Sequence, residues 1–151
     1  MANQAFYPTS LGYLKIGYTC NAIVSIRLVS APEIPNTPSP LSDLAATQIA
    51  EYLNGHRSAF DLPTTPSGTY FQKQVWEELC RIPWGETRTY GQIAAALGKP
   101  GASRAVGMAC NKNPLWILIP CHRVVGSGKK LTGYAGGLAL KQHLLDLEQK
   151  P

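Results

Sequence analysis

Apolar and polar residues alternate over parts of the first thirty positions, which is the pattern of a half-buried β-strand. Segments 6–18 and 22–29 are rich in Tyr, Ile, Val and Leu, residue types that are common in strands. The pattern is interrupted between them, at Cys20 and Asn21. We therefore predict a β-hairpin that is formed by these two segments and turns near Cys20 and Asn21.

A loop and then a helix are predicted next. Residues 30–40 include four prolines, which are incompatible with regular structure. A helix is expected over 41–53, with Ser42 or Asp43 at its N-cap and Gly55 as its terminator. The sequence Leu-Pro-Thr-Thr-Pro-Ser-Gly that follows later is typical of a linker.

This linker, residues 62–68, divides the chain into two predicted domains. Residues 1–68 form a small strand-plus-helix structural domain in which no residue pattern suggests chemistry. In residues 69–151, apolar side chains recur at helical spacing from Phe71 to Ile82, and the sequence Pro-Trp-Gly then ends that helix.

Two short helices joined by a glycine-containing turn are predicted after it. Thr89 and Gln92 have the capping-box spacing at the start of the first, which covers 93–97, and the second covers 102–111. This is the helix-turn-helix pattern, but ordinary helical hairpins share it, so it leaves DNA binding open. The expected fold class is α/β (α+β), with a helical, winged helix-turn-helix-like second domain.

The most informative segment follows. Four apolar residues at 116–119 predict a buried strand, which a proline ends, and Cys121, His122 and Arg123 come directly after it. Side chains this reactive and this polar need partners when they are buried. A glycine-rich loop then leads to a final helix at 138–149, expected to bury Leu140, Leu144 and Leu147.

Composition and charge narrow the function classes. The 151 residues, 44% of them hydrophobic, suffice for a core without metals or disulfides. No apolar run is long enough to span a membrane and no signal peptide is recognisable, so we expect a cytoplasmic protein and no membrane partner. The four cysteines are widely spaced, which predicts reduced thiols and no metal site.

The positive charge is concentrated in the second half of the chain. Residues 1–71 contain three Lys/Arg and four Asp/Glu, whereas residues 72–151 contain eleven and five. A basic half is compatible with a polyanionic partner such as nucleic acid, although many basic domains bind none.

Cys121 is the candidate nucleophile. A lone cysteine beside an apolar segment is more often an inert packing residue, and the thiolate needs neighbours that stabilise it. In an extended strand His122 would point to the opposite face, so either the chain turns after Pro120 or a water links the two side chains.

The sequence Pro-Cys-His-Arg-Val at 120–124, preceded by apolar residues, resembles the active-site signature of the O6-alkylguanine-DNA alkyltransferases. The resemblance covers residues 69–149 closely and residues 1–68 only in general layout. It implies a relay from Glu148 through His122 and a water to Cys121. It also implies a structural role for Arg123, for which a phosphate contact is the alternative.

The same resemblance assigns further roles. Arg104, in a matching Arg-Ala-Val-Gly segment, replaces the flipped base, and Ala102, Ser103 and Gly107 keep that DNA-binding helix slim enough for the minor groove. Asn113 is a hinge that ties the helix-turn-helix to the active-site turn.

The implied base pocket completes the assignments. Tyr90 donates a proton towards guanine N3, and Tyr134 lines the pocket. The backbone carbonyls of Cys121 and Val124 read the exocyclic amine, and the backbone N–H of Ala135 reaches O6.

Two residues depart from the family pattern. Trp116 stands at the edge of the pocket where the human enzyme has proline, and Thr132 stands where a glycine is usual. Both add bulk beside the alkyl group. We therefore expect a preference for methyl over benzyl adducts and resistance to free O6-benzylguanine.

The leading hypothesis is a monomeric DNA repair protein that flips O6-alkylguanine, or O4-methylthymine, from double-stranded DNA. Cys121 would take the alkyl group once, irreversibly and without a cofactor. A non-catalytic module that binds alkylated lesions is the alternative, although such proteins lack the cysteine. A Cys-His-Glu hydrolase is a third possibility, but it would not explain Arg104.

Overall fold

The computed structural model describes residues 2–149, apart from the side chain of Lys129. The chain forms two compact units. The first comprises the residues up to Ser67 together with Pro114–Trp116, and the second comprises Gly68–Asn113 and the chain from Ile117 onwards. None of the helices in the described part is long and apolar enough to cross a membrane.

The first unit is an antiparallel sheet in the order β1-β2-β3, with strands Asn3–Thr9, Gly12–Tyr18 and Ile23–Val29. The turn predicted near Cys20 and Asn21 joins β2 to β3. The prediction of one strand over 6–18 is wrong, because the chain reverses at Ser10 and Leu11. The Thr9 hydroxyl stabilises that turn by accepting from Leu11 N and donating to Gly12 O.

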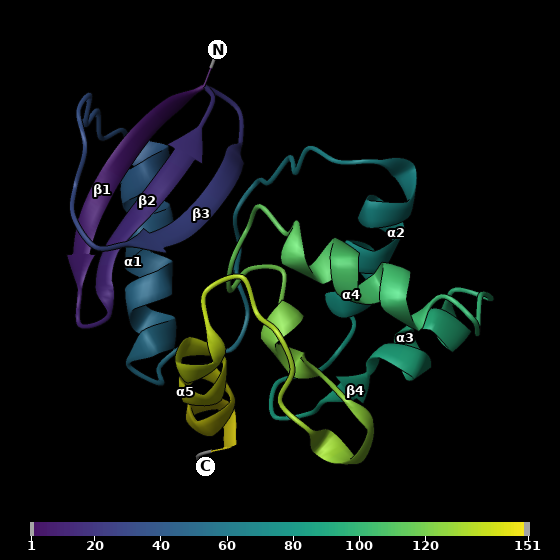
Figure 1. Ribbon diagram of the computed structural model, residues 1–151. Helices are drawn as coiled ribbons and strands as arrows, with labels where there is room; N and C mark the ends of the chain where they lie inside the picture. Colours follow the sequence, from purple (N-terminus) through teal and green to yellow (C-terminus); the bar gives the residue numbers. More distant parts are fainter. Residues whose placement is uncertain (1, 150–151) are drawn as a thin grey trace. The chain divides into compact units, whose positions relative to one another are not determined.

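Helix α1 (Pro40–Leu53) packs against this sheet, as Figure 1 shows. Neither Ser42 nor Asp43 is its N-cap. Ser39 is the cap and Ser42 is the N3 residue of a capping box, in which each hydroxyl accepts from the other residue's backbone N–H. Pro40 can begin the helix because backbone N–H groups in the first turn have no helical acceptor, so the missing N–H of proline costs no hydrogen bond.

The segment Pro114–Trp116 lies beside β3 in the first unit. Ile26 N donates to Pro114 O over 2.8 Å, and Trp116 N donates to Ile26 O over 3.1 Å. The strand predicted over 116–119 is therefore wrong. Only isolated bridge residues form there, at Leu115, Trp116 and Ile119, and the chain turns at Ile117, which has a φ of 77°.

The second unit packs three helices together: α2 (Tyr70–Leu79), α3 (Tyr90–Ala96) and α4 (Ser103–Asn111). The predicted capping box at Thr89 and Gln92 is confirmed, but α3 includes the turn 90–92 that we had placed before the helix. Trp76 fixes α2 to α4 by donating from Nε1 to Ala109 O over 2.9 Å. This arrangement leaves one side of α4 exposed.

A short parallel pair, β4 (Arg88–Thr89) and β5 (Val124–Val125), joins the helices to the segment that carries Cys121. Two single 3₁₀ turns flank β5, η1 (Cys121–Arg123) and η2 (Ser127–Lys129). The last helix, α5, covers Leu138–Gln149, as predicted, and packs on η1. Figure 1 shows η1 and α5 side by side, and this pairing positions the site described next.

Candidate functional site

Cys121 begins the single turn η1. The chain therefore turns after Pro120, which is one of the two alternatives that the sequence left open for His122. Arg123 N donates to Pro120 O over 2.9 Å and closes the turn. The turn is buried: Cys121 is 2% exposed, His122 is fully buried and Arg123 is 8% exposed. A reactive thiol is thereby held on tightly folded backbone inside the second unit.

Asn113 connects the end of α4 to this turn. Its Nδ2 donates to Ile119 O over 2.9 Å and to Cys121 Sγ over 3.2 Å, and the side chain is buried. The first bond gives Ile119 O a partner that a neighbouring strand would otherwise supply, which explains why the predicted strand is dispensable. The second bond places an amide donor directly on the sulfur.

Glu148 of α5 holds the other two residues of the turn. Its Oε2 accepts from His122 Nε2 over 2.7 Å, and its two oxygens accept from Arg123 Nε and Nη2 over 2.7 and 2.9 Å. Arg123 Nη1 also donates to Ile82 O over 2.7 Å. Arg123 is thus a buried ion-pair partner, and the alternative of a phosphate contact is wrong.

The buried face of α5 differs from the one we predicted. Lys141, Leu144 and Glu148 are buried, whereas Leu140 and Leu147 are only half-buried. Apolar periodicity alone placed the face one residue too early, because it assigns a lysine and a glutamate to solvent. Here the ion pair and hydrogen bonds of the site keep both charged side chains in the interior.

Burial controls the protonation of the reactive pair. It raises the pKa of the Cys121 thiol, against which the hydrogen bond from Asn113 and the charge of Lys141 act. It lowers the pKa of His122, against which the hydrogen bond to Glu148 acts. Both shifts favour the uncharged forms, so at neutral pH Cys121 is a thiol that can donate a proton and His122 is a neutral imidazole that can accept one.

The aromatic residues predicted for the base pocket lie in the same unit. Tyr90, the first residue of α3, shares a hydrogen bond of 2.8 Å with Thr132 Oγ1, and burial raises the pKa of its hydroxyl. Tyr134 is buried, and its hydroxyl helps to lower the pKa of the Cys121 thiol. The Tyr90 hydroxyl therefore stays protonated and able to donate.

The other predicted pocket residues differ in placement. Val124 is fully buried at the end of η1, and Ala135 is exposed in the glycine-rich loop. Trp116 belongs to the first unit, where its backbone pairs with Ile26. Val124 and Ala135 are thus in the same unit as Cys121, whereas Trp116 is not.

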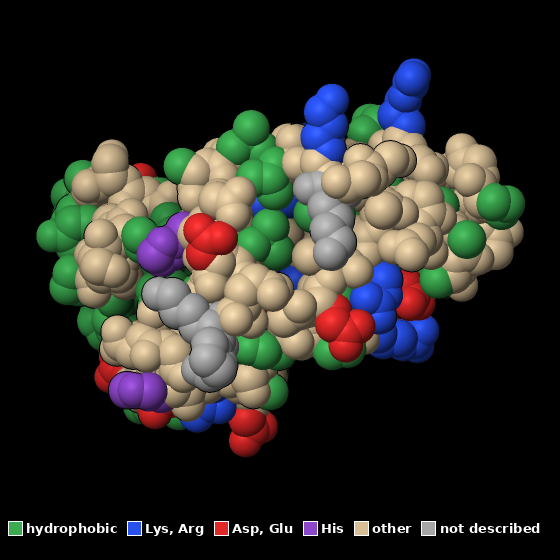
Figure 2. Space-filling model, turned by 90° about the horizontal axis from the view of Figure 1, so that it is seen from below, with side chains coloured by type: hydrophobic (Ala, Val, Ile, Leu, Met, Phe, Trp, Pro, Cys, Tyr) green, Lys and Arg blue, Asp and Glu red, His purple; other side chains and the backbone are tan. Residues whose placement is uncertain are grey.

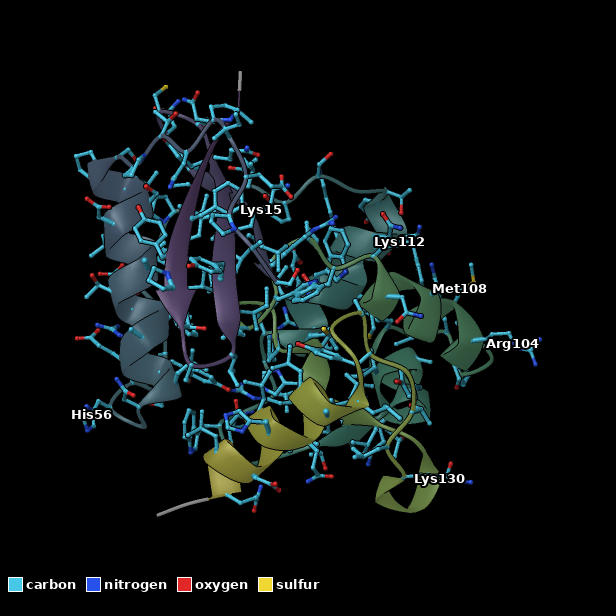
Figure 3. All side chains as sticks on the ribbon, turned by 60° about the vertical axis from the view of Figure 1, so that its left-hand side comes forward. Lys15, His56, Arg104, Met108, Lys112 and Lys130 are labelled. Carbon is cyan, nitrogen blue, oxygen red and sulfur yellow. The ribbon has the colours of Figure 1, made fainter. Side chains whose placement is uncertain are left out.

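The predicted DNA-contacting residues lie on α4. Arg104 is exposed in its first turn, and Ala102 and Ser103 precede it half-buried. A Cβ on Gly107 would lie 3.7 Å from the Tyr90 ring, in ordinary contact. Figure 3 shows Arg104 pointing away from the body of the second unit, so the structure does not bring it to the Cys121 cluster.

A family model described as the DNA-binding domain of 6-O-methylguanine DNA methyltransferase matches residues 70–150, which include α4, Cys121 and Glu148. The chain belongs to this family.

Curated relatives carry the corresponding name. The methylated-DNA–protein-cysteine methyltransferase of Methanosarcina barkeri is 59% identical over 105 residues, which are 70% of this chain and 66% of that protein. The chain thus matches about two thirds of that relative's length. The enzyme of the same name from Mycolicibacterium paratuberculosis is 42% identical over 145 residues, covering 93% of this chain and 88% of the relative.

Solved structures of the family have the same fold. The O6-methylguanine methyltransferase of Mycobacterium tuberculosis has a TM-score of 0.88 at 40% identity, covering 99% of this chain and 93% of that one. The M. tuberculosis protein has also been solved in complex with DNA, with a TM-score of 0.87 at 40% identity, covering 97% and 92%. The mixed α/β fold predicted from the sequence is confirmed.

Lys141 is a member of the Cys121 site that sequence reasoning missed. It is fully buried, and its Nζ donates to Thr132 O over 3.2 Å and lies 5.9 Å from the centre of the Tyr90 ring. Its charge lowers the pKa of Cys121. Lys141 is seven residues before Glu148 and therefore on the same helical face. This spacing predicts a buried Lys141 only when Glu148 is already known to be buried.

No group of three or more His, Cys, Asp and Glu side chains within residues 2–149 could hold a metal ion. The reactive groups of the site are the thiol of Cys121, the imidazole of His122 and the amide of Asn113, together with the three buried charges of Arg123, Lys141 and Glu148.

Proposed function

We propose that this protein repairs double-stranded DNA by transferring the alkyl group of O6-alkylguanine to Cys121 in a single irreversible reaction. The carrying observation is the Cys121 sulfur, which accepts a hydrogen bond from Asn113 over 3.2 Å and belongs to the same short turn as an imidazole that is held by Glu148. The names of the relatives support the reaction type.

In the proposed reaction the sulfur attacks the alkyl carbon in line, forming the S–C bond while the C–O6 bond breaks. The thiol proton passes to His122, and Tyr90 gives its hydroxyl proton to N3 of the departing guanine. These two proton transfers are completed when His122 gives its added proton back to Tyr90, which restores the hydroxyl. A thioether is a poor leaving group, so each molecule acts once.

We propose that Asn113 acts as a hinge and that Lys141 stabilises the thiolate. Tyr134 would line the base pocket. The exocyclic amine would be read by the carbonyls of Cys121 and Val124, and O6 by the N–H of Ala135. The Cys121 carbonyl already accepts from Val124 N, which leaves its second lone pair for the base.

We further propose that residues 69–151 form the DNA-binding and transfer domain and residues 1–68 a structural domain. Arg104 would fill the gap left by the flipped base, because a guanidinium can stack and hydrogen-bond there. Lys and Arg side chains stand clear of the surface in Figure 2, where they are available to phosphates. The protein would act as a monomer in the cytoplasm.

Intact mass measurement tests the proposal. The protein is incubated with a duplex that carries one O6-methylguanine, and a Cys121→Ala variant is treated in parallel. We expect the mass of one methyl group to be added to the Cys121 peptide of the wild type alone. DNA binding without a mass change would instead identify a non-catalytic lesion-binding module, and repeated turnover would identify a hydrolase.

A further inference from the structure

The exposed side of α4 carries one long apolar side chain between two basic ones. Val106, Ala109 and Cys110 form its buried side. Arg104 and Lys112 are exposed on the other side, and between them Met108 is 65% exposed. Figure 3 shows these three side chains along the same outer edge of the helix.

The spacing of the three residues matches a path along DNA. Residues four apart lie one above the other and are separated by about 6 Å along a helix. Base pairs are spaced by about 3.4 Å, so Met108 would be roughly two base pairs from Arg104 if the helix followed a groove. Lys112 would lie a further turn along, and neither basic side chain forms an ion pair within residues 2–149.

We infer that Met108 is a second minor-groove contact, which packs against the sugar walls and base edges beside the nucleotide that Arg104 replaces. This inference rests on the proposed function. The minor groove is about 6 Å wide, and its walls are apolar sugar surfaces that a flexible thioether chain can follow. Methionine is among the apolar residues that DNA-bending proteins insert from this groove.

The flanking charges favour DNA over a protein partner. An apolar protein groove would have to desolvate Arg104 and Lys112 together with Met108, which is costly unless both cations find carboxylates. Phosphates border the minor groove on both sides, so DNA offers apolar walls and two anionic edges at once. Met108 then contributes a contact that does not depend on salt, and Lys112 one that does.

The test compares Met108→Ala, Met108→Leu and Lys112→Ala, each in a Cys121→Ala background that cannot react. Binding to duplexes with and without O6-methylguanine is measured between about 50 and 200 mM salt. We expect Met108→Ala to bind about five- to tenfold more weakly with an unchanged salt slope. Met108→Leu should stay within about twofold of the parent, and Lys112→Ala should reduce the slope by about 0.9.

Single-turnover repair by the same Met108 variants with Cys121 intact gives a second readout. The rate should fall with affinity at low protein concentration and recover at saturation, as a binding contact requires. Unchanged affinity of Met108→Ala, or Met108→Leu as weak as Met108→Ala, would overturn the inference. If the wild type binds DNA but gains no methyl group, alkyl transfer fails as a function while the binding series still decides the role of Met108.

Discussion

Replacing Glu148 by glutamine isolates the buried ion pair that anchors the site. The side chain keeps its shape and loses its charge. Glu148 now accepts three hydrogen bonds, one from His122 and two from Arg123. In the variant, the NH2 group of the glutamine amide would face an N–H group of His122 or Arg123, so two donors would oppose each other. The Arg123 guanidinium would also keep its charge without a counter-ion.

The expected loss of stability follows from the burial of the pair. The Glu148 side chain is 1% exposed and that of Arg123 is 10% exposed. Removing one partner of such a pair costs about 3–5 kcal/mol, because the other charge stays buried. For a protein of this size, each kcal/mol shifts the melting temperature by roughly 2–4 °C, so Glu148→Gln should melt about 6–20 °C lower.

Glu86 provides a matched control in the same unit. It pairs with Arg88 over 3.0 Å, a distance close to those at Glu148, but its side chain is 52% exposed. Solvent-exposed pairs contribute about 0–1 kcal/mol, so Glu86→Gln should change stability little. The same chemical substitution is thus made once in the interior and once in water.

Urea denaturation followed by circular dichroism measures both variants, with the denaturant slope checked for constancy. Combining Glu148→Gln with Arg123→Met should restore part of the loss, because the uncompensated guanidinium is removed. If Glu148→Gln and Glu86→Gln were equally stable, the charge at Glu148 would be solvated and the buried cluster would be wrong.

Three further predictions concern the same unit. Lys141→Met removes a buried charge while keeping a side chain of similar length. Alkyl transfer at neutral pH should therefore slow by about tenfold, while thermal melting shows equal or higher stability. Burial lowers the pKa of His122, so as the pH falls the unfolded chain binds a proton at this histidine before the folded chain does. The free energy of unfolding, measured by denaturation at several pH values, should therefore fall below about pH 6.5. The fall should be smaller in His122→Asn. Thr132→Gly removes the hydroxyl that contacts Tyr90, and it should speed inactivation by free O6-benzylguanine, measured as loss of repair activity.

Local signals in the sequence predicted local structure well. The capping box at Thr89 and Gln92 and the bounds of α5 were found, because side chain to backbone bonds and helical periodicity are encoded within a few residues. The strand over 116–119 was wrong for the opposite reason. The chain turns at Ile117, and the Asn113 amide at the end of α4 supplies a hydrogen bond to Ile119 O that a neighbouring strand would otherwise supply.

The site itself was only partly predictable from the residues. The Pro-Cys-His-Arg-Val signature located Cys121, but the partners of His122 and Arg123 come from a helix about 25 residues further along the chain. A glutamate and a lysine on an amphipathic helix are normally solvated, so sequence alone places Glu148 and Lys141 outside the core. Their burial becomes evident only when α5 is packed on η1.

The hydrogen bond between His122 and Glu148 also determines the direction of proton movement. A carboxylate can only accept, so Nε2 carries the hydrogen and the lone pair is on Nδ1. Passing the Cys121 proton to that lone pair leaves the net charge of the buried cluster unchanged, which limits the cost of ionising a thiol whose pKa is raised by burial.

Once the sulfur is alkylated, this balance is lost. The thioether is neutral, so a protonated His122 would add an uncompensated positive charge next to Arg123 and Lys141 in the same buried cluster. The departing guanine anion is the group that can remove it, through the protonated hydroxyl of Tyr90. The proposed reaction therefore requires proton uptake by the base to accompany alkyl transfer, and the irreversible step leaves His122 neutral and Cys121 alkylated, without a nucleophile.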